Sequence, residues 1–195
     1  MAARARRDQG PLPAVGARER ARHLEQLSGY RFLAGRGPKP SATRIPAPLR
    51  YWQYDPPPRF AVLFTLAVVT IWLGAFGWLD GASALRAEAP LAVGLGLAVL
   101  GFNVGRLTVS DHAVSTDSAG TRTPPHRIVP LAMVREVRLG PLPSDWPQPT
   151  RRGGRWPGRT QVAVRHLADD VRTEQAFTHW VRDPHAFATA LGQSL

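Results

Sequence analysis

The sequence predicts a membrane α-helical hairpin followed by a small α+β domain. Residues 60–79 and 90–105 are two apolar segments without charge, and only residues 80–89 separate them. Beyond residue 105, short runs of alternating apolar and polar residues are typical of half-buried strands. The pair Asp183-Pro184 then predicts one C-terminal helix, because Asp is a preferred N-cap and Pro a preferred first helical residue.

The charge of the chain is distributed unevenly along its 195 residues. The net charge of +11 divides into +8 for residues 1–59, −1 for residues 60–105 and +4 for residues 106–195. The excess of basic residues at the two ends of the chain therefore indicates on which side of the membrane these ends lie. We expect no nucleic-acid partner. The chain has no cysteine, which excludes disulfides, thiolate catalysis and cysteine-containing zinc sites.

Residues 1–59 are predicted to form a basic, proline-rich cytoplasmic tail. Residues 1–15 are predicted to be disordered, residues 16–28 to form a short helix that Gly29 ends, and residues 34–58 to form an extended linker. Two interpretations of the tail stay open. It is attracted to anionic lipid of the inner leaflet, or it is an extension without a role.

The first predicted transmembrane helix covers residues 60–79, of which eleven are Leu, Ile, Val or Phe. Twenty helical residues span about 30 Å, the thickness of a hydrocarbon core. The second predicted helix covers residues 90–107 and opens on Pro90, with Arg106 near its other end. Residues 80–89 are the predicted extracytoplasmic loop.

Basic residues predict the orientation of this hairpin. Arg44, Arg50 and Arg59 precede the first segment and Arg106 and Arg122 follow the second, whereas the connecting loop holds only Arg86. The excess places both termini in the cytoplasm, with two spans in the cell (inner) membrane. The aromatic residues Tyr51, Trp52 and Tyr54 suit the inner headgroup zone, and Trp72 and Trp78 suit the outer half.

Small residues at helical spacing predict how the two helices pack. Small side chains let helix backbones approach closely in lipid, where no hydrophobic effect drives association. The simplest interpretation is that the two stripes face each other within the chain; the alternative is that one faces another protein or another copy. The predicted packing residues are Ala67, Thr70, Gly74, Gly77, Gly94, Ala98, Gly101 and Gly105.

The C-terminal domain, residues 108–195, is predicted to contain short strands and one closing helix. The predicted strands are 106–110, 112–116, 127–130, 134–139, 161–167 and one within 172–181, with a loop at 140–158. The closing helix runs from Asp183-Pro184 through Phe187 to Leu191.

These elements resemble a known family. The chain resembles small actinobacterial two-helix membrane proteins with a cytoplasmic bacterial pleckstrin-homology-like domain. The resemblance rests on Ile128, Pro130 and Leu131, which a Val-rich strand follows, and on the Asp183-Pro184 cap. The resemblance covers residues 50–192. It implies a PH-like antiparallel β-barrel or sandwich closed by one C-terminal helix, and no catalytic residues. The insertion at 140–160 departs from the tight hairpin that the family leads us to expect.

One loop is predicted to contact the membrane surface through Arg151, Arg152, Arg155, Trp156 and Arg159. Arginines attract anionic headgroups and a tryptophan suits the interface. The alternatives are a solvated surface loop and a nucleic-acid contact of the RGG type, of which there is a single repeat.

Motifs of catalysis and metal binding are not found in the sequence. The six histidines show no metal-ligand spacing, and Ser110-Asp111-His112 cannot form a relay, because neighbouring strand residues point to opposite faces. We expect no enzyme, cofactor or metal. The predicted function is a non-enzymatic scaffold or interaction module at the cytoplasmic face. The alternatives are an accessory subunit of a larger membrane complex, packed through the glycine-rich helices, and a membrane-tethered enzyme.

Overall fold

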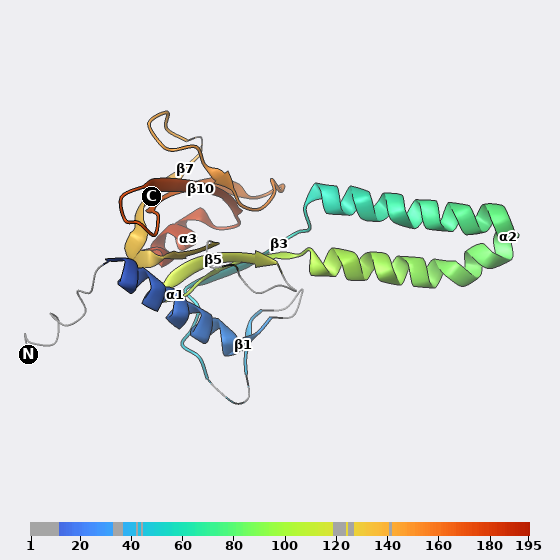
Figure 1. Ribbon diagram of the computed structural model, residues 1–195, viewed down its shortest axis with the longest axis horizontal. Helices are drawn as coiled ribbons and strands as arrows, with labels where there is room; N and C mark the ends of the chain where they lie inside the picture. The colour runs from blue at the N-terminus through green and yellow to red at the C-terminus, as the bar shows by residue number, and fades with distance from the viewer. Residues whose placement is uncertain are drawn as a thin grey trace, which may run out of the picture.

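The computed structural model describes residues 12–32, 37–41, 43, 45–118, 124, 127–140 and 142–195. Two four-stranded sheets form a domain, and one long, folded helix projects from it (Figure 1). Residues 1–11 of the predicted disordered segment lie outside the described residues, as do Arg44 and Arg122 of the orientation argument.

The first sheet is antiparallel throughout and has the order β3-β4-β5-β6. Its strands are β3 (Tyr51–Asp55), β4 (Gly105–Val109), β5 (Ala113–Ser118) and β6 (Ile128–Pro130). β3 and β4 are neighbours although the helix α2 (Arg59–Phe102) separates them in the chain. The register joins Asp55 to Gly105, so both ends of α2 start from the same edge of the domain.

The second sheet has the order β7-β9-β10-β8. Its strands are β7 (Val134–Leu139), β8 (Thr150–Arg151), β9 (Thr160–Leu167) and β10 (Glu174–Val181), and only β8 runs parallel to its neighbour. A 3₁₀ turn, η2 (Leu131–Met133), leads from one sheet to the other. A separate two-stranded sheet pairs β1 (Tyr30–Arg31) with β2 (Lys39–Pro40).

One hydrophobic core receives side chains from both large sheets and from α3 (Pro184–Ala190). Leu107 comes from the first sheet, Phe177 from the second and Phe187 from α3, and all three are fully buried. The carboxylate of Asp183 caps α3 by accepting a hydrogen bond from the amide of Ala186 at 2.9 Å. This confirms the predicted closing helix and its cap.

The helix α1 (Leu12–Ser28) lies against the first sheet, with contacts to β5 and β6 (Figure 1). Its buried His23 lies 2.7 Å from the hydroxyl of Ser110, measured from Nδ1. Glu19 of the same helix pairs with His112 at 2.7 Å. The segment predicted as a short helix at 16–28 therefore begins earlier, at Leu12, and belongs to the domain.

The helix α2 has 44 residues and turns back on itself at Gly81. Gly81 has φ 78° and ψ −166°, a conformation that is open to glycine because it has no Cβ. Two arms of about 22 residues, each roughly 33 Å long, therefore run side by side in opposite directions (Figure 1). The tryptophan Trp72 of one arm donates a hydrogen bond to Glu88 of the other at 3.2 Å.

The seam between the arms is formed by Thr65 and Val69 on one side and by Ala92 and Gly96 on the other. A Cβ on Gly96 would lie 3.1 Å from Val69 and 3.2 Å from Thr65. The close approach of the arms thus depends on this glycine, as expected for helices that pack through small residues.

The predicted fold class is wrong in two respects. The chain forms one helical element from Arg59 to Phe102 with a single interruption, whereas two helices and a ten-residue loop at 80–89 were predicted. The strands of the described residues form three sheets, none of which is closed, in place of the predicted PH-like barrel or sandwich. Among the described residues, no backbone ladder joins β3 to β10; their contact includes a side-chain hydrogen bond that Gln53 donates to the carbonyl of Trp180 at 2.9 Å.

The helix α2 is long and apolar enough to cross a membrane. Its apolar side chains lie on the outside, as shown by Ile71 at 71% and Leu97 at 65% exposure, whereas the core helix of a soluble protein is mostly buried. Within α2, only Thr65, Ala92 and Gly96 are buried.

We predict that Gly96→Leu separates the two arms and lowers the stability of the protein by about 1–3 kcal/mol, because the added side chain overfills the seam. Gly94→Leu is the matched control, since a Cβ at Gly94 meets nothing within 4 Å. Thermal unfolding of the full chain in mild detergent measures the difference. Equal melting temperatures for the two variants would contradict the observed seam.

The stability of the domain is predicted to fall as the pH drops from 6.5 to 4. Burial, followed by the charges of His112 and Arg106, lowers the pKa of His23 to about 4. The unfolded chain then binds the extra proton in this window and the folded one does not, so acid favours unfolding, by roughly 2 kcal/mol between pH 7 and pH 5. Unfolding at the two pH values should show this loss in the wild type and in the exposed control His185→Gln. The pH dependence should shrink in His23→Gln.

Candidate functional site

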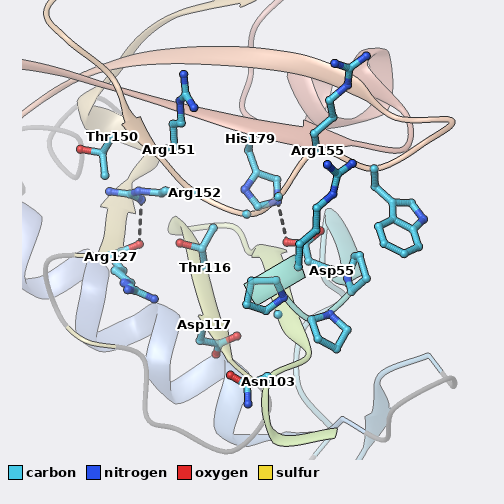
Figure 2. A pocket seen from close by; sticks show the side chains of 18 of the residues that line it. Asp55, Asn103, Thr116, Asp117, Arg127, Thr150, Arg151, Arg152, Arg155 and His179 are labelled. Carbon is cyan, nitrogen blue, oxygen red and sulfur yellow. Dashed lines mark hydrogen bonds and ion pairs between the residues drawn. The ribbon is translucent and has the colours of Figure 1, made fainter. Parts of the chain in front are cut away.

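A cavity of about 920 Å³ opens where α2 joins the domain. Its walls come from both sheets, from the Pro56–Pro58 segment before α2 and from Asn103 after it (Figure 2). Because each end of α2 is only a few residues from its strand, the cavity lies directly beside both helix ends.

Asp55, the last residue of β3, is the centre of a buried polar network. Its carboxylate pairs with Arg159, lies 2.8 Å from Nε2 of His179 and accepts a hydrogen bond from Gln53 at 2.8 Å. The side chains of Asp55 and Arg159 are each 8% exposed. Burial alone would raise the pKa of Asp55, but its contacts with His179 and Arg159 outweigh burial and hold the pKa below its usual value. The folded domain therefore holds Asp55 as a carboxylate.

The loop between β8 and β9 reaches the cavity through Gly153. Gly153 has φ 77°, and a Cβ there would lie 2.8 Å from the ring of His179. Only glycine allows both the left-handed backbone and this close approach.

Arginines dominate the remaining wall. They are Arg59, Arg127, Arg151, Arg152 and Arg155, and none of them forms an ion pair with an acid among the described residues. The two carboxylates of the wall are already paired, Asp55 as above and Asp117 with Arg106. The cavity is therefore strongly electropositive.

Arg152 is the most constrained of these arginines. It donates a hydrogen bond to the carbonyl of Arg127 at 3.2 Å, and its guanidinium lies 4.3 Å from the centre of the Phe177 ring. Burial, followed by the positive charge of Arg127, lowers the pKa of Arg152 to about 10. Figure 2 shows Arg152 and Thr116 on one side of the cavity and His179 with Asp55 on the other.

Thr116 of β5 also lines the cavity and has an unusual hydroxyl group. Thr116 is 7% exposed, and its Oγ1 is buried without a hydrogen-bond partner among the described residues. Buried hydroxyl groups are normally paired, so this one requires an explanation.

The five residues predicted to contact the membrane surface divide into two groups. Arg151, Arg155 and Trp156 are exposed, and Arg155 lies over the ring of Trp180 at 5.7 Å. Arg152 is half-buried, and Arg159 is a buried partner of Asp55 that also donates to the carbonyl of Tyr54 at 2.6 Å. Arg159 is therefore a structural residue and not a surface contact.

Most of the residues predicted to pack the two helices do not lie at the seam between the arms. Gly105 lies in β4, where a Cβ would come within 3.0 Å of Asp55, and Gly77 faces Leu85. Gly77 is thus the one predicted helix residue that faces the other arm, close to the turn, and the other members of the two stripes lie on the helix faces opposite Thr65 and Gly96. The exposed members are Ala67, Thr70, Gly74, Gly94, Ala98 and Gly101. The alternative, in which they face a partner, stays a prediction.

Sequence reasoning missed the residues at the centre of the site, namely Asp55, Thr116, Arg127 and His179. Tyr51, predicted to lie among headgroups, instead packs edge-on against Phe187 at 5.5 Å. The alternating residues 51–55 could have indicated a strand, but the following prolines favoured a linker. Within the described residues, no group of three or more His, Asp or Glu side chains could hold a metal ion.

Comparisons with protein-family models, with curated proteins and with solved structures found no match to this chain. The similarity to two-helix membrane proteins with PH-like domains thus gains no support from them.

We predict that Arg159→Gln destabilises the protein by about 3 kcal/mol, because it leaves the buried carboxylate of Asp55 with a weaker set of partners. Arg155→Gln removes the same charge from an exposed position and should change the stability by less than about 0.5 kcal/mol. Thermal unfolding of both variants checks this. A similar loss in both would mean that the pair with Asp55 has no special role.

Proposed function

We propose that this chain is a membrane-anchored, non-enzymatic interaction module, which holds its two-sheet domain against the cytoplasmic face of the cell membrane. The observation that carries the proposal is the outward-facing apolar surface of α2. Each arm, at roughly 33 Å, matches a hydrocarbon core of about 30 Å. We propose that both arms cross the bilayer and that both termini are cytoplasmic.

The short connections between α2 and the domain support a fixed position of the domain relative to the membrane surface. Pro56–Pro58 join β3 to the first arm, and Asn103 and Val104 join the second arm to β4. Connections this short hold the edge of the domain within the headgroup zone. Arg151, Arg155 and Trp156 are exposed at the cavity beside this junction, where they are available to anionic lipid.

The chemistry of the cavity supports binding over catalysis. Asp55, Asp117 and His179 are engaged in ion pairs within the domain. A general acid or base has to be free to exchange a proton with a substrate. The side chains left over are arginines, which bind anions and do not transfer protons at neutral pH.

Cysteine labelling tests the proposed topology, since the chain has no native cysteine. We expect Ser83→Cys, next to the turn at Gly81, to react with a membrane-impermeant maleimide in intact spheroplasts. Ser194→Cys, at the exposed C-terminal end, should react only in inside-out vesicles. Labelling of both positions from one side would exclude two crossings, and labelling of Ser194→Cys from outside would reverse the orientation.

A further inference from the structure

We infer that the cavity beside α2 binds a dianionic phosphate group through Arg127, Arg152 and the hydroxyl of Thr116. The phosphate belongs to a lipid headgroup or to a soluble phosphate. The lipid source rests on the proposed membrane position, whereas the phosphate chemistry does not.

The charge balance of the wall points to an anion. Five arginines face two carboxylates, and these carboxylates are already paired with Arg106, Arg159 and His179. Positive charges without partners in a partly desolvated cavity are unfavourable unless an anion accompanies them.

The short distance between Arg127 and Arg152 indicates where in the cavity the anion binds. These two residues come from different segments, and the guanidinium of Arg152 hydrogen-bonds the backbone of Arg127. After burial, the positive charge of Arg127 contributes to the lowered pKa of Arg152, which shows that the two charges act on each other. A guanidinium donates two parallel hydrogen bonds to phosphate oxygens, and two arginines balance the charge of a dianion.

Thr116 provides an independent observation. Its hydroxyl is buried, has no partner among the described residues and belongs to the wall that also holds Arg152 (Figure 2). A hydroxyl donates one hydrogen bond, and a phosphate oxygen would complete it. Donors from three separate elements suit a tetrahedral group with several acceptor oxygens.

The location of the cavity favours lipid as the source of the phosphate. Pro58, Arg59 and Asn103, at the two ends of α2, line the same cavity as Arg152. A headgroup in the inner leaflet would therefore lie level with the arginines, and a lipid with a terminal phosphate carries the dianion.

The test uses the full chain in mild detergent. Native mass spectrometry measures the fraction of protein that retains phosphatidic acid, which has a terminal phosphate, or phosphatidylglycerol, which has a phosphodiester. In a parallel arm, thermal unfolding is followed with inorganic phosphate and with sodium chloride at equal ionic strength. We expect the wild type to retain phosphatidic acid in preference to phosphatidylglycerol. Stabilisation by inorganic phosphate but no retention of lipid would assign the same site to a soluble phosphate.

Three variants locate the binding. Arg152→Gln should weaken binding at least about tenfold, because it removes charge-assisted hydrogen bonds. Arg135→Gln removes the same charge from an exposed position outside the cavity and should bind as the wild type does. Thr116→Val removes the unpaired hydroxyl; it should weaken binding about tenfold without lowering the melting temperature, which separates loss of binding from loss of fold.

Three results would overturn the inference. They are the absence of any effect of phosphatidic acid and of inorganic phosphate, retention of both lipids in equal and measurable amounts, and equal binding by Arg135→Gln and Arg152→Gln. Each of them is compatible with the labelling pattern expected for the membrane anchor, so failure of the phosphate site is distinguishable from failure of the proposed topology.

Discussion

The pairing of β3 with β4 is the constraint on which the rest of the structure depends. Asp55 lies opposite Gly105, so the two ends of α2 must start from adjacent strands. A straight helix of 44 residues would place its ends about 66 Å apart. The helix therefore has to turn back, and Gly81 provides the conformation for the turn. The absence of a Cβ at Gly105 lets the two strands meet closely where the arms leave the domain.

The same pairing creates the polar centre of the domain. β3 brings Asp55 and Gln53 to the boundary between the two sheets, where Asp55 meets His179 of β10 and Arg159, the residue before β9. These bonds join the segment before α2 to strands near the C-terminus. Residues of both sheets thus contact the strand β3, from which α2 begins. The domain leaves open, beside the attachment of α2, a cavity whose free charges are arginines.

Patterns that are local in the sequence predicted much of the fold correctly. The strands β4, β5, β6, β7, β9 and β10 lie within a few residues of the predicted ranges, and Asp183 caps the last helix as predicted. The apolar character of residues 60–79 and 90–105 predicted two membrane-spanning helices, and the structure has one interrupted helix that is long and apolar enough to cross a membrane. The wrong predictions about the helix concern which residues of its two arms contact each other. Both arms carry several small residues, and periodicity alone could not show that Gly96, and not Gly94, faces the other arm.

By itself, the sequence determined the apolar helix, the alternating strands and the uneven distribution of charge, because hydrophobicity and residue spacing act over a few turns or strands. Only the tertiary structure decided which arginines are free. Arg159 and Arg151 belong to the same basic loop, yet the fold buries the first against Asp55, about a hundred residues away, and leaves the second exposed. The physical reason is that the role of a charged side chain depends on the group that it contacts. Contacts between segments distant in the sequence depend on the packing of the whole domain.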